Sequence, residues 1–293
     1  MKDIKCGINT NGIGLENPNF IEKGGFFSEP AKKIEDRSQV SEDDCIKFVL
    51  FDVFGTVVNL RKTMINEFAV LFDQKGIKNV NCEEFVDVWA NAYSENMKNI
   101  SEGKNSFATV DELNKIALNK TLKKYQIYNK LTEVDRDYMW MVWHRLEPWP
   151  DSVSGINEIK KQFKVGTLSN GNIQLLKDLS ENANLEWDII LSGELFRCYK
   201  PDPLVYQYAA RELKLKPSEI LLVASHKYDL EAARQCGYKT AYIFRPLEFK
   251  TVKKGQIPHD NEFDLMADGI DDLAEKLIQK IPEQRDRFSF SGY

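Results

Sequence analysis

The sequence predicts an α/β fold, in which a Rossmann-like, mainly parallel sheet flanked by helices carries an inserted helical cap domain. Three observations support this prediction. A short apolar run, Phe48–Phe51, ends abruptly at a turn, as buried parallel strands do. Apolar residues at helical spacing then continue from residue 61 to residue 147. Beyond them, strand-like and helix-like segments alternate, which is typical of βαβ units.

The first strand, Phe48–Phe51, is followed directly by Asp52, Phe54, Gly55 and Thr56. Open α/β sheets bind their ligands outside the carboxyl ends of the strands. We therefore expect Asp52 to stand at the mouth of a site. Residues 45–60 are expected to form the first part of the core domain.

The segment 61–147 is expected to form the cap. Its apolar residues recur every three or four positions, and Gly76 and residues 102–105 separate the helices. The pattern comprises Met64, Phe68, Leu71 and Phe72, then Phe85, Val88, Trp89 and Ala92, then Val110, Leu113 and Leu122, and finally Met139, Val142 and Trp143. Packing within a helical core is the simplest interpretation of these aromatic and methionine residues.

The core domain is expected to resume at Pro148 and to run over residues 148–285. Strands are predicted at 165–168, 189–191, 220–223 and 241–243. Helices are predicted through Leu175 and Leu176, over 204–213 and from 229 to about 237. The sheet therefore begins before the helical segment and continues after it, as expected for a core domain with an inserted cap.

Composition limits the function further. The 293-residue chain has 29% charged and 42% hydrophobic residues and a net charge of −5, which fits a globular protein and gives no electrostatic footprint for nucleic acid. No apolar run approaches the ~18 residues of a membrane span, and no signal-peptide pattern is seen. Five scattered cysteines without a CxxC pair favour reduced thiols and a cytoplasmic location. Residues 1–44 are expected to be a disordered or loosely docked extension.

Chemistry-bearing residues gather in four predicted loops at strand ends. The first loop carries Asp52 and Thr56, the second Ser169 and Asn170, the third Lys200 ahead of a helix with Tyr206, and the fourth His226 and Asp229. Each loop alone is weak evidence for a functional site, but the four loops in this order around a helical insertion form a specific pattern.

In this order, the segments 51–56, 167–171, 199–206 and 223–233 resemble the haloacid dehalogenase superfamily, in its L-2-haloacid dehalogenase (type II) branch. The resemblance covers roughly residues 46–280. Most phosphatases of the superfamily have a second Asp where this chain has Phe54, and an Asp that binds Mg²⁺ where it has Ser225. Because Mg²⁺ prefers carboxylate and water ligands, we expect no metal and no cofactor.

The resemblance implies covalent catalysis on a small-molecule substrate, a 2-haloacid such as L-2-chloropropionate. Asp52 would displace halide to form an aspartyl ester, which water then cleaves. Lys200 would keep Asp52 ionised, and Thr56 and Ser169 would orient it through hydrogen bonds. Asn170 would help to cradle the halide.

Further roles follow from the same resemblance. Tyr206 and Asp229 would orient Lys200 and its surroundings. His226 would act as the general base in ester hydrolysis, since imidazole titrates near neutral pH. Glu67, on the first cap helix, would orient His226. His144 and His259 have no comparable neighbours in the sequence.

The substrate wall is expected to include Phe54, Tyr206 and Trp89. In the dehalogenase family a Trp-Arg pair on the second cap helix recognises the substrate, whereas this chain has Trp89-Ala90. An anionic haloacid would thereby lose a charge-assisted contact worth ~1.5–3 kcal/mol. Another residue compensates, or short haloacids are poor substrates, or the natural substrate differs.

Two other functions stay open at this point. A phosphatase acting on a small phosphorylated metabolite is one, with Phe54 and Ser225 against it. A catalytically weak relative that binds a small molecule is the other, motivated by Ala90. Neither a nucleic-acid nor a membrane partner is expected, and a homodimer is possible.

Overall fold

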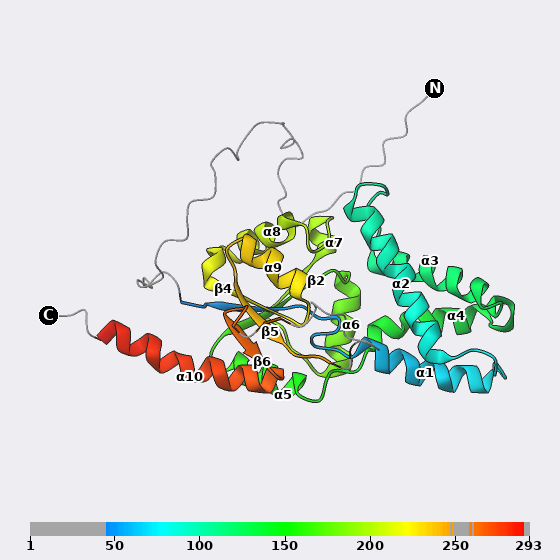
Figure 1. Cartoon of the computed structure of the whole chain (residues 1–293), viewed down its shortest axis with the longest axis horizontal. Helices are drawn as coiled ribbons and strands as arrows, with labels where there is room; N and C mark the ends of the chain where they lie inside the picture. The colour runs from blue at the N-terminus through cyan, green and yellow to red at the C-terminus, as the bar shows by residue number, and fades with distance from the viewer. Residues whose placement is uncertain (1–44, 247, 249–257, 260, 290–293) are drawn as a thin grey trace, which may run out of the picture. The chain divides into compact units, whose positions relative to one another are not determined.

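The computed structural model describes residues 45–246, 248, 258–259 and 261–289, with side chains up to residue 279. The predicted extension, residues 1–44, lies outside the described residues. A six-stranded parallel sheet has the order β3-β2-β1-β4-β5-β6 (Figure 1). Its strands are β1 (Phe48–Phe51), β2 (Lys164–Ser169), β3 (Ile189–Ser192), β4 (Ile220–Ala224), β5 (Lys239–Ile243) and β6 (Leu265–Ala267). The predicted α/β class and parallel sheet are confirmed.

The register of the sheet brings the strand ends level. Phe51, the last residue of β1, is paired with Thr167 of β2 and with Val223 of β4. The loops that follow these three strands therefore leave the sheet at the same edge, as the rule for open α/β sheets requires. This alignment is what brings residues distant in sequence into one site.

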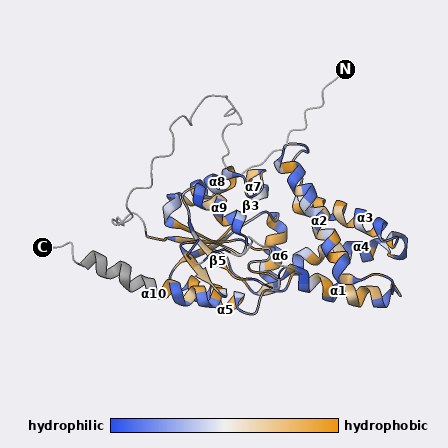
Figure 2. Ribbon diagram, viewed as in Figure 1, coloured by the Kyte–Doolittle hydropathy of each residue, from blue (hydrophilic) through white to orange (hydrophobic). Residues whose placement is uncertain are grey.

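Alternate residues of β1 face two separate apolar layers. Val49 and Phe51 pack in one cluster with α5 (Ser152–Lys160), α6 (Ile173–Ala183) and α10 (Ile270–Ser289). Leu50 packs in the other with α8 (Pro203–Leu213) and α9 (Lys227–Gln235). All four β1 side chains are buried, which is why the strand is a continuous apolar run. Figure 2 shows this apolar interior along the strands, with hydrophilic residues on the outer helix faces.

Four α-helices and two short 3₁₀ segments lie between β1 and α5 in the chain. They are α1 (Leu60–Gln74), α2 (Cys82–Ser101), α3 (Val110–Lys124), η2 (Tyr128–Lys130), α4 (Glu133–Trp140) and η3 (Met141–Arg145). Their interior contains an aromatic cluster in which Phe68 lies within 6.3 Å of Phe72, Phe85 and Trp89, measured between ring centroids. The helical periodicity of the sequence is therefore core packing here, as predicted. The exact domain bounds stay predictions.

The remaining elements are short. They are α7 (Gly193–Phe196) and η4 (Pro217–Glu219). Within the described part of the chain, no helix is both long enough and apolar enough to span a bilayer.

Candidate active site

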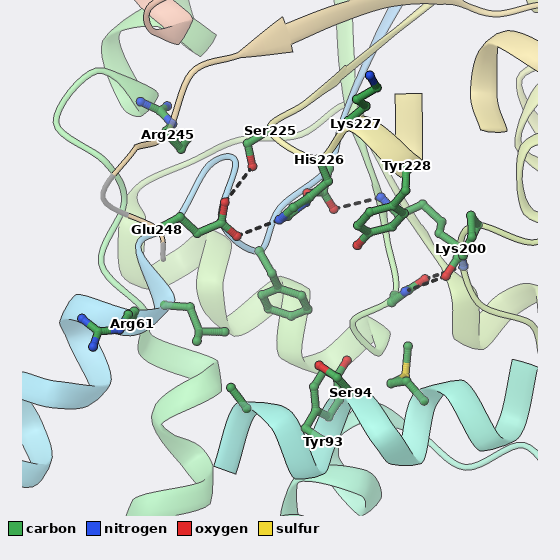
Figure 3. Close-up of a pocket in the computed structure, with 18 of the residues that line it drawn as sticks. Arg61, Tyr93, Ser94, Lys200, Ser225, His226, Lys227, Tyr228, Arg245 and Glu248 are labelled. Atoms are coloured by element: carbon green, nitrogen blue, oxygen red, sulfur yellow. Dashed lines mark hydrogen bonds and ion pairs between the residues drawn. The ribbon is translucent and has the colours of Figure 1, made fainter. Parts of the chain in front are cut away.

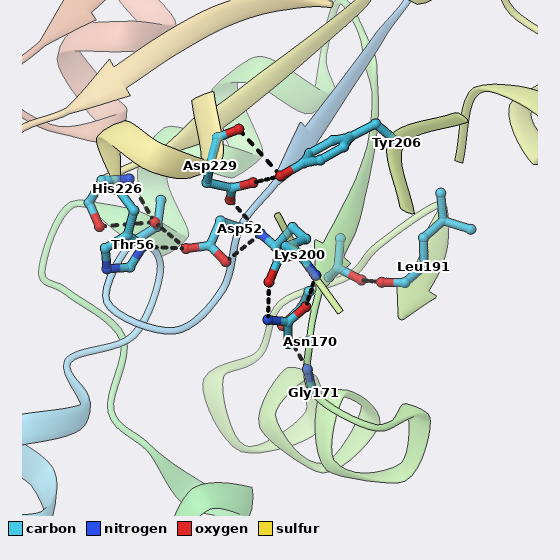
Figure 4. Close-up of polar contacts among 12 residues, drawn as sticks. Asp52, Thr56, Asn170, Gly171, Leu191, Lys200, Tyr206, His226 and Asp229 are labelled. Atoms are coloured by element: carbon cyan, nitrogen blue, oxygen red, sulfur yellow. Dashed lines mark hydrogen bonds and ion pairs between the residues drawn. The ribbon is translucent and has the colours of Figure 1, made fainter. Parts of the chain in front are cut away.

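Asp52 is the first residue after β1, and its carboxylate is held on both oxygens. Its backbone N–H donates to Val223 O at 2.9 Å, which extends the sheet by one bond. Lys200 Nζ donates to Oδ1 at 2.8 Å, and the Thr56 hydroxyl donates to Oδ2 at 2.8 Å (Figure 4). The Asp52 residue is 5% exposed. A carboxylate that is held by hydrogen bonds and almost excluded from solvent can react through one oxygen while the other stays hydrogen-bonded.

Lys200 lies between two carboxylates. Besides Asp52, its Nζ contacts Asp229 Oδ2 at 2.5 Å, and the Tyr206 hydroxyl donates to Asp229 Oδ1 at 2.6 Å. Burial alone would lower the pKa of Lys200, but Asp229 and Asp52 raise it well above its usual value. Lys200 is therefore a permanent cation at this site.

The surroundings of Asp52 decide its protonation. Burial alone would raise the pKa of Asp52, but Lys200 and His226 lower it well below its usual range. Burial raises the pKa of Asp229, and Lys200 opposes that rise. Lys200 and His226 thus favour the ionised form of Asp52, as a nucleophile requires.

His226 lies between Asp52 and Glu248, and the sequence did not predict Glu248 as a site residue. Its Nδ1 is 3.2 Å from Asp52 Oδ2, and its Nε2 is 2.7 Å from Glu248 Oε1 (Figure 3). Burial alone would lower the pKa of His226, but Glu248 and the hydrogen bond with Asp52 raise it well above its ordinary value. The imidazole is therefore protonated while Asp52 is a free carboxylate.

Glu248 follows β5, in a loop without a recognisable motif, so no sequence signal pointed to it. Its Oε2 accepts a hydrogen bond from the Ser225 hydroxyl at 3.2 Å. Gly55, which has a φ of +82°, lies directly against it: a Cβ at this glycine would be 2.0 Å from Glu248 Oε1. A glycine in the turn after β1 is thus needed for its backbone conformation, and a side chain there would displace the Glu248 carboxylate.

The expectation that Glu67 orients His226 is wrong. Both oxygens of Glu67 accept hydrogen bonds from Arg145, at 3.0 Å from Nε and closer still from Nη2. Arg145 Nη2 also donates to Tyr138 O. Glu67 therefore ties α1 to the segment that leads back from the helices, and Glu248 occupies the place next to His226.

Ser169 is the last residue of β2 and Asn170 follows it, and only Asn170 lines the cavity. The Ser169 hydroxyl accepts a hydrogen bond from Gly171 N at 3.1 Å, and it makes no hydrogen bond to Asp52. The expected orienting role of Ser169 is therefore wrong. Asn170 lines the cavity, and its Oδ1 accepts from Lys200 N at 2.8 Å. Asn170 thus fixes the loop that carries Lys200.

Three residues were expected to form the substrate wall, and the structure places one of them there. Phe54 lines the cavity and packs edge-on against Trp143, with centroids 5.0 Å apart. Trp89 is 1% exposed and donates through Nε1 to Asn114 O inside the helical core, so its expected substrate contact is wrong. Tyr206 is fully buried and reaches Asp229 rather than the cavity.

A cavity of about 890 Å³ opens in front of Asp52. One wall carries Asp52, Lys200, Asn170, His226 and Glu248. The opposite wall comes from α2 and its neighbours, and Figure 3 shows Tyr93 and Ser94 on that helix facing the loops with His226 and Glu248. A substrate in this cavity would meet a charged wall on one side and a helix on the other.

The position corresponding to the family's guanidinium, Ala90, lies on this helix and lines the cavity without any charge. Arg61, at the start of α1, also lines it, with a side chain that is 18% exposed. Its Nε and Nη2 are held by Asp87 and Glu83. Arg61 is thus a positioned guanidinium that sequence reasoning did not single out.

His144 has two carboxylate partners, which the sequence did not predict. Its Nδ1 is 2.6 Å from Asp178 Oδ2 of α6, and its Nε2 is 3.1 Å from Asp111 Oδ1 of α3. Burial alone would lower the pKa of His144, but the two carboxylates raise it. His144 therefore joins a helix of the insertion to a helix of the sheet layer, away from the cavity.

Among the residues that the structure describes, no three His, Cys, Asp or Glu side chains are arranged to hold a metal ion. The donors around Asp52 are instead an ammonium, an imidazole and a hydroxyl.

Comparison with known proteins identifies the family of the chain. A family model described as haloacid dehalogenase-like hydrolase matches residues 46–237. Curated relatives include (S)-2-haloacid dehalogenase 1 of Pseudomonas sp. (strain CBS-3), 28% identical over 206 residues, or 69% of this chain and 86% of that protein. (S)-2-haloacid dehalogenase 4A of Burkholderia cepacia is 26% identical over 208 residues, or 69% of this chain and 84% of that protein.

Solved structures agree with these relatives. The L-2-haloacid dehalogenase PA0810 is 37% identical with a TM-score of 0.75, over 80% of this chain and 99% of that chain. The defluorinating L-2-haloacid dehalogenase Rha0230 is 37% identical with a TM-score of 0.76, over 80% of this chain and 95% of that chain.

Proposed function

The chain belongs to the haloacid dehalogenase-like hydrolases, in their L-2-haloacid dehalogenase branch, and we propose that it hydrolyses the carbon–halogen bond of 2-haloacids to give 2-hydroxy acids. The observation that carries this proposal is the state of Asp52. It is a buried carboxylate kept ionised by Lys200 and His226 at the mouth of a cavity with a largely apolar opposite wall. Such a carboxylate is a nucleophile for carbon.

In the first step, one oxygen of Asp52 attacks C2 of the substrate from the side opposite the halogen. The new C–O bond forms as the C–X bond breaks, and the halide leaves with the bonding electron pair. Configuration at C2 is inverted, and no proton is needed because halide is a stable anion. Asn170, which lines the cavity next to Lys200, is assigned to the departing halide.

In the second step, water attacks the carbonyl carbon of the Asp52 ester. His226 accepts the proton of the water and returns it to the departing 2-hydroxy acid, and Asp52 regains its carboxylate. The switch in His226 has an electrostatic cause. Esterification removes the negative charge 3.2 Å from Nδ1, so the pKa of His226 falls, its proton passes to solvent and a neutral imidazole becomes available. The second proton of the attacking water restores the imidazolium when Asp52 ionises again. Glu248, 2.7 Å from Nε2, holds the ring and stabilises the imidazolium that forms.

The reaction is proposed to be independent of metal ions. Two observations support this. Asp52 accepts hydrogen bonds from the Lys200 ammonium and the Thr56 hydroxyl. Phe54 and Ser225 stand at positions where metal-dependent relatives would need carboxylates. Halide, unlike an alkoxide, requires no acid at the position of Phe54.

The direct test is halide release from L- and D-2-chloropropionate and from bromo- and iodoacetate, with EDTA and without added metal. The proposal predicts release from the L substrate and the haloacetates, and none from the Asp52→Asn variant. The control is p-nitrophenyl phosphate with Mg²⁺. Phosphate release in the control, with no halide release from any haloacid, would contradict the proposal and would indicate a phosphatase.

A further inference from the structure

The cavity in front of Asp52 is far larger than a short haloacid requires. Its volume is about 890 Å³. A molecule of the size of 2-chloropropionate takes up about 90 Å³, roughly the share of three water molecules in the liquid. A cavity of several hundred cubic ångströms is instead typical of ligands many times that size.

The cavity extends along α2, where an apolar row of side chains runs beside the polar Asp87, Ser94, Lys98 and Ser101. Val86, Ala90, Tyr93 and Met97 of α2 all line the cavity, and their spacing of four, three and four residues puts them on one side of the helix. We call these four residues the α2 stripe. Its hydrophobic surroundings are completed by Leu60, Phe54 and Trp143.

The α2 stripe contains no charged side chain, and Ala90 is its smallest member. Tyr93 keeps its hydroxyl neutral, because burial raises its pKa well above the usual value. Charges on this side belong to Arg61 and Asp87, which pair with each other, and to Lys98, which pairs with Glu102. Ala90 thus makes a recess among the larger apolar side chains of the α2 stripe, in the cavity that Asp52 also lines.

We propose that this recess is a binding subsite for the 2-substituent of the substrate, so that the preferred substrates are 2-halocarboxylic acids with an alkyl or aryl group of about four to eight carbons. The inference rests on the proposed function. Asp52 would hold the reacting carbon, and the substituent would extend to the α2 stripe. Ala90 would be the specificity-determining residue, because its side chain sets the depth of the recess.

The first experiment measures kcat/KM for halide release along the series of L-2-bromo acids from propionate to octanoate. Each methylene that enters an apolar site contributes about fourfold, so kcat/KM should rise by at least tenfold between propionate and hexanoate. A flat or falling series would overturn the subsite and would mean that the protein closes around short substrates.

The second experiment fills the recess. Ala90→Leu should lower kcat/KM for L-2-bromooctanoate at least tenfold and change the value for L-2-bromopropionate less than threefold. The matched control is Asn91→Leu, which adds a similar side chain at the neighbouring exposed position of α2. Ala90→Val is a milder second variant with an intermediate expected loss. Equal losses for both substrates in all Ala90 variants would overturn the assignment.

A third experiment separates the subsite from the reaction. Calorimetric titration of the unmodified protein with octanoate and propionate should give at least tenfold tighter binding of octanoate. Tight octanoate binding without halide release from any substrate would support the subsite and overturn the proposed function. Halide release from short haloacids without tighter octanoate binding would do the reverse.

Discussion

Replacing Glu248 by glutamine tests how His226 is prepared for its role as the base. The variant keeps the size of the side chain and removes its charge. The lost contact is a 2.7 Å hydrogen bond between a carboxylate and an imidazole, of the charge-assisted kind that is worth ~1.5–3 kcal/mol. If that stabilisation is expressed in the transition state for ester hydrolysis, the hydrolysis rate falls by about ten- to a hundredfold.

The two chemical steps should respond differently. Ester formation depends on Asp52, Lys200 and Thr56, none of which contacts Glu248 directly. Rapid-quench kinetics with L-2-chloropropionate should therefore show a burst of about one halide per active site in the Glu248→Gln variant, followed by slow turnover. Glu231→Gln is the matched control, since Glu231 lines the same cavity but faces Lys227. It should leave both steps unchanged.

The pH dependence gives an independent check with a fixed sign. Glu248 raises the pKa of His226 by stabilising the imidazolium. Without Glu248 the pKa falls, so the acidic limb of the kcat profile should shift to lower pH while the plateau drops. Equal slowing of both steps, or an unshifted limb, would refute the role of Glu248.

Three further predictions concern other contacts. Lys200→Met leaves Asp52 and Asp229 as adjacent buried carboxylates without their cation. The free energy of unfolding, measured in urea at pH 7, should therefore fall by ~3–5 kcal/mol. A smaller fall would contradict the buried ion pairs of Lys200. Arg61→Gln should raise KM for L-2-chloropropionate about tenfold and leave KM for the uncharged 2-chloropropionamide unchanged; equal effects would rule out recognition of the carboxylate by Arg61. The folded-state pKa of His144 is raised by its two aspartate partners, so its contribution to stability is complete below about pH 6.5 and is lost as the pH rises through that raised value. His144→Gln should therefore destabilise the protein in urea unfolding at pH 6 more than at pH 9, and equal destabilisation would contradict the ionic contacts.

Sequence reasoning found the residues that strand topology brings together. Asp52 and His226 follow β1 and β4, which are adjacent parallel strands, so their loops had to meet at one edge of the sheet. Lys200 and Asp229 were located in the same way, because they lie in loops or helix starts at that edge. The α/β class followed from the continuous apolar strands, whose burial on both faces the structure confirms.

The errors have an equally physical origin. Helical periodicity shows that Glu67 lies on a polar face, but not whether Arg145 or His226 is within reach. Trp89 belongs to an aromatic stripe, and such residues more often pack in a core than line a site. Glu248 was missed because it follows an inner strand in a loop whose path no local pattern specifies.

The covalent intermediate on Asp52 is tested most directly by a single turnover of L-2-chloropropionate with excess protein in H₂¹⁸O. In the proposed mechanism, water attacks the carbonyl carbon of the Asp52 ester, so the heavy oxygen stays in the protein. Mass spectrometry of the peptide that contains Asp52 should show a gain of one ¹⁸O, and the 2-hydroxy acid should be unlabelled. Label in the 2-hydroxy acid with none at Asp52 would mean that water attacks the substrate directly, and it would contradict the nucleophilic role of Asp52.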